Sequence, residues 1–576
     1  MPPAMAPSTQ TAIDGPMSLP FDRCDHISRH IGPNVFPNFF LFSRLVRWAH
    51  KPLTAVRDLT FGFEASYAQL LTDVLYLRNR LRQLLDPSIV QRIDQEEEVF
   101  ILLLGPAGYE FTVGFLALIA LGAVIVPISP DLPVKEATYF ATKSQAAAVI
   151  TAERCIDLGT GLQEEIRTSG SPSFCTLSIR PHLMQPCLDP SEFLVSSDRY
   201  MDLNKSGYVI FTSGTTGPPK GAVKRRGFLY DVASQFSDQH GISEGDLVLH
   251  TLPVHHATGI TVTLLPFLWS GGEIEFRSGG FDTAWTWERI RRADLDFFSG
   301  VPTIYMRLMR HYEQHLSKLP HAAQYAAGAE HIRAMLCGTS ALPRSLQQKW
   351  TKLRGGKPIL TRFGGTEFGN GFTVSPSLAQ QGVPDGSVGK KGPGVDLILS
   401  NDGEILIRNT LLFSKYLNDE RATLDALNPD GYFKTGDIAR REGDFYFILG
   451  RASIDIMKSG GYKISALDIE REIMGLEYVA EAMVVGVEDE EFGQRVAAAI
   501  VLRDDLREKL TLDELRQDLR SSLAGYKMPT ILRVVSELRK NATGKVIKKA
   551  LVNELFPESG HDDVQRWVSR KVSSKL

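Results

Sequence analysis

The sequence predicts an α/β protein built mainly on parallel sheets. Short apolar, β-branched runs recur through the first three quarters of the 576 residues and alternate with segments of helical periodicity. Strands separated by helices are typical of βαβ units. We therefore expect a large N-terminal domain with a small β-rich subdomain, followed by a small mobile α/β domain. The apolar runs lie at residues 99–105, 123–128, 146–152, 208–213 and 246–253.

The chain is long enough for several domains. Its first residues, MPPAMAPSTQTAIDGPMSLP, lack the basic start and apolar core of a secretory signal, which favours a disordered or irregular lead. In residues 386–448, short strands are joined by tight turns, and Asn401-Asp402-Gly403 predicts a hairpin. The expected segments are a lead at 1–50, a large domain at 51–449, a linker at 450–456, a small domain at 457–556 and a tail at 557–576.

Composition favours small-molecule partners over nucleic acid. The chain has 64 Lys and Arg against 67 Asp and Glu, a net charge of -3, and 43% hydrophobic residues. That balance is typical of a soluble globular protein and gives no basic surface for phosphate backbones. The five cysteines are scattered without a C-x-x-C pair, so neither a disulfide framework nor a zinc site is indicated, and a reducing compartment fits.

Two segments bear on location. Residues 111–128 contain eighteen uncharged residues, but Gly122 and the β-branched residues before Pro127 divide them into a buried helix and a buried strand. No membrane span is therefore expected. The last three residues, Ser574, Lys575 and Leu576, match the address of the peroxisomal matrix, so a peroxisomal import receptor is an expected partner.

The stretch YVIFTSGTTGPPKG, at residues 208–221, predicts an anion-binding loop at a strand end. Its hydroxyls can donate hydrogen bonds, and its glycines let the backbone turn N–H groups toward one anion. Lys220 adds a positive charge. A kinase-type P-loop is excluded because Pro219 precedes this lysine and Gly221 follows it, leaving no hydroxyl for a metal. The loop residues are Thr212, Ser213, Gly214, Thr215, Thr216 and Gly217.

Three later segments complement the loop. Residues 363–367 (FGGTE) combine an aromatic ring for a planar base, glycines for close backbone approach and a carboxylate for a metal beside phosphates. Asp437, in YFKTGD, can accept both hydroxyls of a ribose. Lys545, in NATGKV, is presented on a turn.

Together the motifs FTSGTTGPPKG, FGGTEFG, YFKTGD, GRASIDIMKSGGYKIS and NATGKV resemble, in this order, the adenylate-forming (AMP-binding) acyl-CoA synthetase superfamily. The resemblance covers residues 55–556 and is closest to the malonyl-CoA synthetase branch, through residues 252–259, 301–305 and 450–470. The C-terminal SKL is similar to that of peroxisomal fungal acyl-CoA ligases of secondary metabolism. The resemblance implies an ATP-dependent ligase that forms an acyl-adenylate and then an acyl-CoA, with ATP, Mg²⁺ and CoA.

The resemblance also implies a role for each motif. The loop at 212–217, with Lys220, would hold the leaving pyrophosphate, and Lys545 would bridge the substrate carboxylate and the α-phosphate. The alternative for this lysine is a solvated surface position. The other implied nucleotide contacts are Thr366 with the α-phosphate, Glu367 with Mg²⁺, Asp437 and Arg451 with the ribose, and Gly338, Thr339, Ser340, Phe363, Gly364 and Gly365 around the adenine.

After adenylation, the resemblance implies that the small domain rotates and that residues 458–463 replace Lys545 in the site. Lys458, Gly460, Gly461 and Tyr462 would then bind CoA, with the glycines leaving room for pantetheine. The hinge lies within residues 453–455, where this branch carries an extra residue, so no single pivot is assigned.

The acyl pocket is expected at His256, Thr303 and Arg362. His256 would be a gate or positioning group, with a buried structural histidine as the alternative. Arg362 would bind the second carboxylate of malonate, with a salt-bridging structural arginine as the alternative.

Several departures leave the acid open. His255 replaces an aromatic residue common in the family, and Gly280 lies where some malonyl enzymes carry arginine, with Arg277 as a weaker substitute. We therefore expect a medium-chain, hydroxylated or polyketide-derived acid, with malonate or methylmalonate as the alternative. Acyl transfer to a carrier protein and a catalytically dead binding protein are further alternatives.

Overall fold

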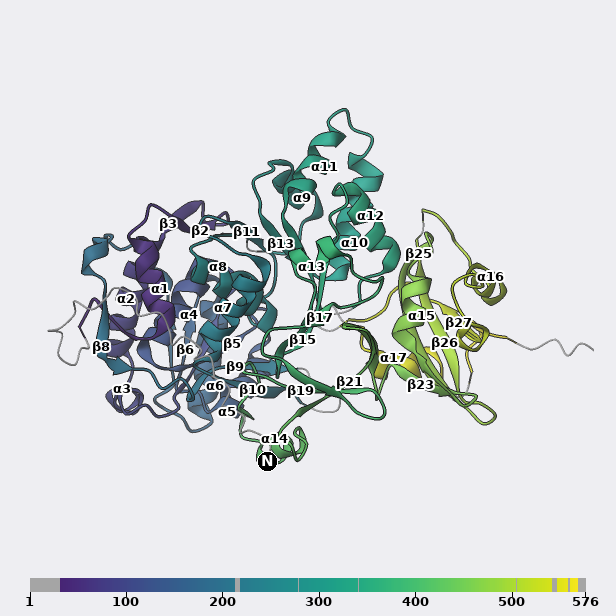
Figure 1. Cartoon of the computed structure of the whole chain (residues 1–576). Helices are drawn as coiled ribbons and strands as arrows, with labels where there is room; N and C mark the ends of the chain where they lie inside the picture. The colour runs from purple at the N-terminus through teal and green to yellow at the C-terminus, as the bar shows by residue number, and fades with distance from the viewer. Residues whose placement is uncertain are drawn as a thin grey trace, which may run out of the picture.

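The computed structural model describes residues 32–212, 218–277, 279–339, 341–503, 505–540, 546–557 and 560–567. Their arrangement confirms the predicted α/β class, with two large sheets, a four-stranded sheet and a six-stranded C-terminal sheet. In Figure 1 the green four-stranded subdomain lies between the blue and teal sheets and the yellow-green C-terminal part.

The first large sheet has the strand order β20-β10-β9-β5-β4-β6-β7. Its central strands are parallel, whereas β9 and β10 form an antiparallel hairpin. The strands are β4 (Phe100–Leu104), β5 (Val124–Ile128), β6 (Ala148–Thr151), β7 (Cys175–Ser178), β9 (Ser206–Thr212), β10 (Lys220–Arg225) and β20 (Lys415–Tyr416). The helices of this part of the chain are α2 (Tyr67–Leu84), α3 (Pro87–Asp94), α4 (Tyr109–Leu121), α5 (Val134–Ser144) and α6 (Ile156–Thr168).

Helix α4 is buried along its whole length and ends at Gly122, whose φ of 96° a residue with a side chain rarely adopts. The chain then enters β5, so residues 111–128 form a helix and a strand, as predicted. Within the described ranges, no helix has the length and apolar character needed to span a bilayer.

The second large sheet has the order β17-β16-β15-β14-β13-β11-β12-β2-β3. The strands are β2 (Thr54–Asp58), β3 (Phe63–Ser66), β11 (Leu247–His250), β12 (Glu273–Phe276), β13 (Phe297–Gly300), β14 (Ala334–Cys337), β15 (Leu360–Gly365), β16 (Gly369–Thr373) and β17 (Lys390–Lys391). The helices are α7 (Phe228–His240), η4 (Gly259–Leu264), α8 (Leu265–Ser270), α9 (Thr283–Arg291), α10 (Pro302–His311), η5 (Tyr312–Leu316), α11 (Ala322–His331), α12 (Arg344–Leu353) and α13 (Pro376–Gln381). Because β11, β13, β14 and β15 are parallel, the loops after their carboxyl ends meet at one edge.

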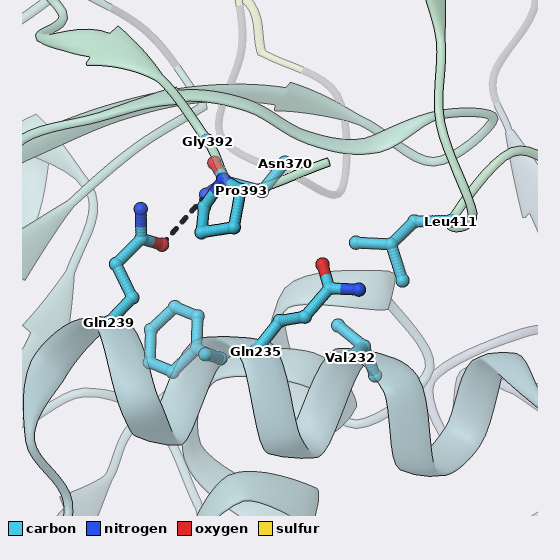
Figure 2. Close-up of a pocket in the computed structure, with 8 residues that line it drawn as sticks. Val232, Gln235, Gln239, Asn370, Gly392, Pro393 and Leu411 are labelled. Atoms are coloured by element: carbon cyan, nitrogen blue, oxygen red, sulfur yellow. Dashed lines mark hydrogen bonds between the residues drawn. The ribbon is translucent and has the colours of Figure 1, made fainter. Parts of the chain in front are cut away.

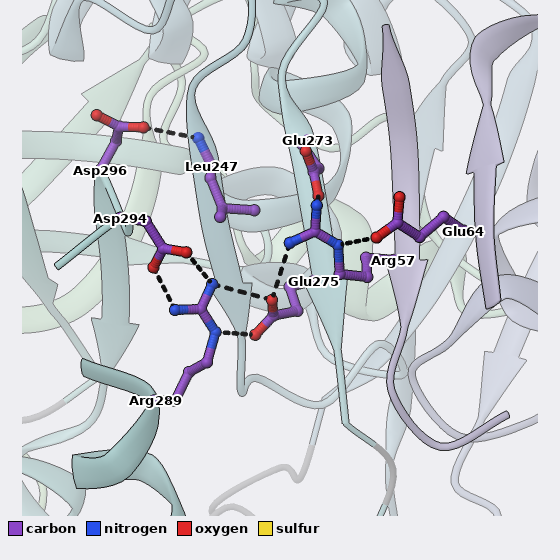
Figure 3. A network of polar contacts seen from close by, with 8 residues as sticks. All are labelled: Arg57, Glu64, Leu247, Glu273, Glu275, Arg289, Asp294 and Asp296. Atoms are coloured by element: carbon purple, nitrogen blue, oxygen red, sulfur yellow. Dashed lines mark hydrogen bonds and ion pairs between the residues drawn. The ribbon is translucent and has the colours of Figure 1, made fainter. Parts of the chain in front are cut away.

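An ion network connects α9 to strands β12 and β2 of this sheet (Figure 3). The Arg289 guanidinium binds both carboxylate oxygens of Glu275, at 2.6 and 3.0 Å, and also pairs with Asp294. Arg289 and Glu275 are buried, and Arg57 lies 3.7 Å from the same glutamate. The network therefore compensates a buried charge on β12 from α9 and from β2.

The four-stranded subdomain has the order β18-β19-β21-β22, with β18 (Asp396–Leu399), β19 (Glu404–Arg408), β21 (Phe433–Glu442) and β22 (Phe445–Arg451), and α14 (Glu420–Asp425) precedes β21. The hairpin predicted at Asn401-Asp402-Gly403 joins β18 to β19. The C-terminal sheet contains β23 (Ile456–Ser459), β24 (Tyr462–Ser465), β25 (Val479–Asp489), β26 (Gly493–Leu502), β27 (Ile531–Val534) and β28 (Val564–Arg566). Its helices are α15 (Ala466–Ile473), α16 (Leu512–Asp518), η6 (Gly525–Lys527) and α17 (Lys548–Leu555).

Both ends of the chain differ from expectation. The irregular lead was expected to reach residue 50, yet β1 (Val35–Asn38) and α1 (Phe40–Ala49) lie within it. In α1 the apolar residues recur at helical spacing and are buried, and β1 pairs with β8 (Leu194–Tyr200), so packing orders this part. At the other end, β28 extends the C-terminal sheet from within the expected tail.

Candidate active site

The predicted phosphate loop is the tip of the β9–β10 hairpin. Thr212 lies opposite Lys220 in the ladder, and its hydroxyl donates to the Lys220 carbonyl oxygen at 3.3 Å. The residues between them, Ser213, Gly214, Thr215, Thr216 and Gly217, lie outside the described residues.

The FGGTE segment is also a hairpin, with Thr366 and Glu367 in the turn between β15 and β16. The two glycines are needed because other atoms of the hairpin lie too close for a side chain at either position. A Cβ on Gly364 would lie 2.2 Å from the Gly369 carbonyl oxygen, and one on Gly365 would lie 2.4 Å from the Phe368 ring. A substitution at either glycine would therefore push the turn out of place.

Tyr416, on β20, joins the two hairpins. Its hydroxyl donates to Glu367 Oε1 at 2.9 Å, and Lys220 Nζ lies 5.2 Å from the centre of its ring. Burial and the negative charge of Glu367 raise the pKa of Tyr416, while Arg451 opposes this shift, so all four side chains share one region. The structure thus brings together the cation of the first motif, the carboxylate of the second and the arginine at the end of β22.

A second bridge to the FGGTE turn starts from Lys224, on β10. Its buried ammonium donates to the main-chain oxygens of Glu367, at 2.9 Å, and Leu411, at 2.6 Å. It also lies over the Phe228 ring, 4.5 Å from the centroid. Burial lowers the pKa of Lys224 to about 7.

The two residues expected at the ribose are cross-strand partners. Asp437 on β21 lies opposite Arg451 on β22, and Arg451 Nε is 3.3 Å from Asp437 Oδ1. Gly338 and Thr339, expected at the adenine, follow the carboxyl end of β14, and Thr339 adopts a φ of 72°. Such a left-handed conformation in a residue with a side chain is typical of functional turns. Ser340 lies outside the described residues, and Phe363 packs against Phe368 and Phe372.

At the expected acyl pocket, His255 and His256 follow β11, and their rings are tilted by 49° with centroids 4.5 Å apart. Burial, and then the neighbouring His256, lower the pKa of His255 to about 3, so His255 is neutral at physiological pH. Thr303 lies in the first turn of α10, directly after β13. The π-helix η4 begins three residues after His256, and such bulges are frequent at functional sites.

Arg362 lies in β15 beside Gly338, where an added Cβ would be 3.2 Å from Arg362 Nε. Within the described residues, the Nε of Arg362 has no hydrogen-bond partner. Burial lowers the pKa of Arg362 to about 10, which leaves it charged. No structural salt bridge of Arg362 is therefore found in the described part of the chain.

The residues expected to bind CoA form the turn of the β23–β24 hairpin. Gly460 and Gly461 have φ values of 54° and 84°, and Lys458 precedes them on β23. Tyr462 is exposed and stacks on Tyr526, with ring centroids 4.5 Å apart.

Lys545 lies outside the described residues, but α17, which begins three residues later, is tied to the interdomain joint. Lys548 Nζ lies 2.6 Å from Asp455 Oδ1 and 2.7 Å from Glu470 Oε1. The other oxygen of Asp455 accepts the N–H of Arg451 at 3.0 Å. The joint thus connects the arginine expected at the ribose to the helix that follows Lys545.

No cluster of three or more metal-binding side chains occurs among the described residues. Glu367 alone offers a carboxylate at the FGGTE turn, held in place by Tyr416. One carboxylate fits Mg²⁺ that takes its other ligands from nucleotide phosphates and water.

Sequence comparison decides the family. Residues 47–417 match the AMP-binding enzyme family, and residues 468–545 match the AMP-binding enzyme C-terminal domain. The chain belongs to the AMP-binding enzymes. The predicted membership of the adenylate-forming superfamily is thereby confirmed.

Among the relatives of this AMP-binding enzyme are three ligases. A CoA ligase of Gibberella moniliformis is 32% identical over 80% of this chain and 86% of its own. The human mitochondrial malonate–CoA ligase ACSF3 is 32% identical over 80% of this chain and 84% of its own. The acyl-CoA ligase oryP of Aspergillus oryzae is 30% identical over 92% and 94%. The crystal structure of ATP-bound MatB from Rhodopseudomonas palustris has the same fold, with a TM-score of 0.75 and 24% identity over 90% of this chain and 99% of its own.

The AMP-binding enzyme is therefore an AMP-forming acyl-CoA synthetase, with ATP, Mg²⁺ and CoA as its co-reactants, as predicted. Two residues that contact the FGGTE turn, Tyr416 and Lys224, were absent from the sequence prediction. Tyr416 lies in a two-residue strand without a local pattern. Lys224 carries only a weak signal, because it begins the basic run Lys224-Arg225-Arg226 directly after the apolar Ala222-Val223 pair, at a position that proves buried.

Proposed function

We propose that the enzyme activates a fatty-acid-like or polyketide-derived carboxylic acid, through an acyl-adenylate, and transfers the acyl group to CoA in secondary metabolism. The observation that carries the proposal is the convergence of Lys220, Tyr416, Glu367 and Arg451 beside a turn fit for one metal ion. Lys220 and Arg451 would supply positive charge there, and a metal held by Glu367 would add to it, against the negative charge that develops when a carboxylate attacks the α-phosphate. The fungal CoA ligase and acyl-CoA ligase relatives support the transfer of an acyl group to CoA.

The test is a panel of acids incubated with ATP, Mg²⁺ and CoA, in which AMP, pyrophosphate and acyl-CoA are quantified. The expected result is acyl-CoA in equal amount to AMP with at least one medium-chain or oxygenated acid. Acyl-adenylate that accumulates without acyl-CoA would instead favour transfer to a carrier protein. No acid-dependent pyrophosphate with any acid would favour a catalytically dead binding protein.

A second candidate, malonate or methylmalonate, is favoured by the unpaired guanidinium of Arg362. A buried cation can compensate a second carboxylate that would otherwise be costly to bury. If malonate is the substrate, Arg362→Met should lower kcat/KM for malonate on the order of 10²-fold, because a charged partner is lost. The same variant should then leave monocarboxylic acids nearly unaffected. Arg421→Met, at an exposed arginine of α14 with no expected role in the site, is the matched control.

We also propose import into peroxisomes through Ser574, Lys575 and Leu576, which lie outside the described residues. A fluorescent fusion that keeps these residues at its carboxyl end should colocalise with a peroxisomal marker. The same fusion with Leu576→Asp should be diffuse, and colocalisation of both fusions would contradict the proposal.

A further inference from the structure

Residues 411–417 form a bridging segment between the two hairpins that carry the phosphate loop and the FGGTE turn. The Leu417 N–H donates to the main-chain oxygen of Gly221, on the strand that follows the phosphate loop, at 2.7 Å. The Phe413 N–H donates to the main-chain oxygen of Glu367 at 2.6 Å. The bridging segment therefore sets where the FGGTE turn lies relative to β10.

Side-chain packing fixes the first part of the bridging segment. Leu411 lies over helix α7 and lines a small hollow with Val232 and Gln235 of that helix (Figure 2). Asn370, on β16, lies at the same hollow, and its carboxamide is hydrogen-bonded to that of Gln239 at 3.2 Å. The bridging segment and β16 are thus both held against α7, which supports the FGGTE turn from two sides.

Tyr416, near the end of the bridging segment, contacts one oxygen of the Glu367 carboxylate. Its hydroxyl donates to Oε1 at 2.9 Å. Within the described ranges, no hydrogen bond or ion pair to Oε2 of Glu367 occurs. The Tyr416 ring is buried against Phe413, with centroids 4.7 Å apart, and its main-chain N–H donates to the Thr423 hydroxyl at 2.9 Å. Because ring and main chain are both fixed, the hydroxyl holds Oε1 and leaves Oε2 available.

A carboxylate can bind a cation through one oxygen or through both. Mg²⁺ is small and demands near-octahedral geometry, and the two oxygens of one carboxylate subtend too narrow an angle for two octahedral positions. Ca²⁺ is larger, takes more oxygen ligands and accepts both oxygens of one carboxylate. A hydrogen bond that occupies Oε1 of Glu367 therefore favours the smaller cation, because it leaves a single oriented oxygen for the metal.

We propose that Tyr416 is a positioning residue that makes Glu367 a one-oxygen ligand, and that it thereby gives the nucleotide-metal site a preference for Mg²⁺ over Ca²⁺. The inference goes beyond the proposed function, because it concerns the choice of metal and holds for any acid. It rests on the metal role that is proposed there for Glu367.

The test measures metal binding without turnover. Mn²⁺ is followed by electron paramagnetic resonance with the enzyme and α,β-methylene-ATP, whose α–β linkage the enzyme cannot cleave, and is then displaced by Mg²⁺ or Ca²⁺. The nucleotide without enzyme gives the baseline. Tyr416→Phe removes the hydroxyl and keeps the ring that lies 5.2 Å from Lys220 Nζ. Tyr478→Phe, which removes a 2.6 Å bond to Asp518 in the C-terminal part of the chain, is the matched control.

In the wild type, Mg²⁺ should displace Mn²⁺ at a concentration at least about 10-fold below that of Ca²⁺. In Tyr416→Phe the affinity for Mg²⁺ should fall about 10-fold, as for the loss of a group that orients a metal ligand, while the affinity for Ca²⁺ should not fall. In activity assays of this variant, KM for Mg²⁺ should rise and kcat at saturating Mg²⁺ should change less than about 2-fold, a split that a displaced turn would not give. Tyr478→Phe should keep the wild-type values.

Glu367→Gln tests whether Tyr416 acts through the carboxylate. Added to Glu367→Gln, the Tyr416→Phe change should not alter the ratio of Mg²⁺ to Ca²⁺ affinity any further. Unchanged Mn²⁺ binding in Glu367→Gln alone would overturn the metal role proposed for that residue.

With the metal role of Glu367 intact, three results would overturn the inference and leave the proposed function standing. The first is equal displacement by Mg²⁺ and Ca²⁺ in the wild type, which needs no variant. The second is an unchanged affinity ratio in Tyr416→Phe, and the third is an equal loss of both affinities in that variant.

Discussion

At the scale of single residues, Lys224 shows how one buried cation can organise a site it does not enter. Its ammonium binds two main-chain oxygens, one of them that of Glu367, and thereby ties β10 to the FGGTE turn. A lysine without a carboxylate partner in a buried position is costly while charged. The structure places that cost at the contact between β10 and the FGGTE turn, where the ammonium binds the Glu367 main-chain oxygen.

Lys224 should make the free energy of unfolding depend on pH in a predictable direction. Burial lowers its pKa from 10.5 to about 7, so between these values the unfolded state binds more protons than the folded state. The contribution of Lys224 to the free energy of unfolding therefore rises with pH from about 7 upward. For one proton, this rise is at most about 1.4 kcal/mol per pH unit.

Urea unfolding of the wild type and Lys224→Met at several pH values from neutral upward measures this effect, because methionine cannot titrate. The difference in stability should shift in favour of the wild type as pH rises. A difference that does not change with pH would contradict a depressed pKa. Lys390→Met, at a partly exposed lysine, controls for general loss of charge.

The residue roles that sequence predicted depend on short, ordered motifs. Thr212, Glu367, Asp437 and Arg451 could be assigned because each stands in a motif whose spacing along the chain is fixed. Tyr416 and Lys224 could not, because their roles come from contacts between segments about 49 and 143 residues apart from Glu367. No pattern in the local sequence indicates a contact between segments so far apart in the chain.

At the scale of elements, the ion network of α9 and β12 explains how a parallel sheet holds a charged residue in its interior. Glu275 is buried in β12, where a β-branched or aliphatic residue is the usual choice. Arg289 from α9 and Arg57 from β2 both approach it. The network fixes the position of α9 against β12 and β2, in the sheet whose other loops carry the residues expected at the acyl pocket.

Arg289→Met should lower the free energy of unfolding of the N-terminal domain by about 3 to 5 kcal/mol, because it leaves Glu275 buried with only the longer contact to Arg57. Chemical denaturation followed by tryptophan fluorescence measures the change. Arg291→Met, which removes an exposed ion pair on the same helix, should cost less than about 1 kcal/mol. Equal losses of unfolding free energy in the two variants would show that the buried Arg289–Glu275 pair stabilises the domain no more than an exposed ion pair does.

At the scale of the whole molecule, the interdomain joint links the two parts that must cooperate in catalysis. Asp455 accepts hydrogen bonds from Arg451 at the end of the nucleotide-side sheet and from Lys548 at the start of α17. The turn with Gly460 and Gly461 joins β23 to β24, which belong to the C-terminal sheet. The C-terminal part of the chain therefore carries both the lysine expected for adenylation and the hairpin expected for CoA.

Two variants should separate these tasks. Lys545→Ala should slow acyl-adenylate formation by about 10² to 10³-fold, the effect of losing one transition-state donor, while supplied acyl-adenylate still yields acyl-CoA. Gly461→Val should do the reverse, slowing thioester formation at least about 10-fold, because valine rarely adopts the φ of 84° at this turn. Single-turnover assays of each half-reaction measure both, with Lys549→Ala as the control on α17. Equal loss of both half-reactions in either variant would contradict the division of labour.

The sequence by itself determined the α/β class, the helix and strand within residues 111–128, the hairpin at residues 401–403 and the order of the nucleotide motifs, because hydrophobic periodicity, turn residues and motif spacing are local properties. Only the tertiary structure decided that residues 35–49 are ordered, that Arg362 has no carboxylate partner among the described residues, and that Tyr416 and Lys224 hold the FGGTE turn. It also placed Gln235, Gln239 and Asn370 around one hollow. These features depend on which distant segments pack together, and that is set by the burial of the whole core rather than by any stretch of the chain.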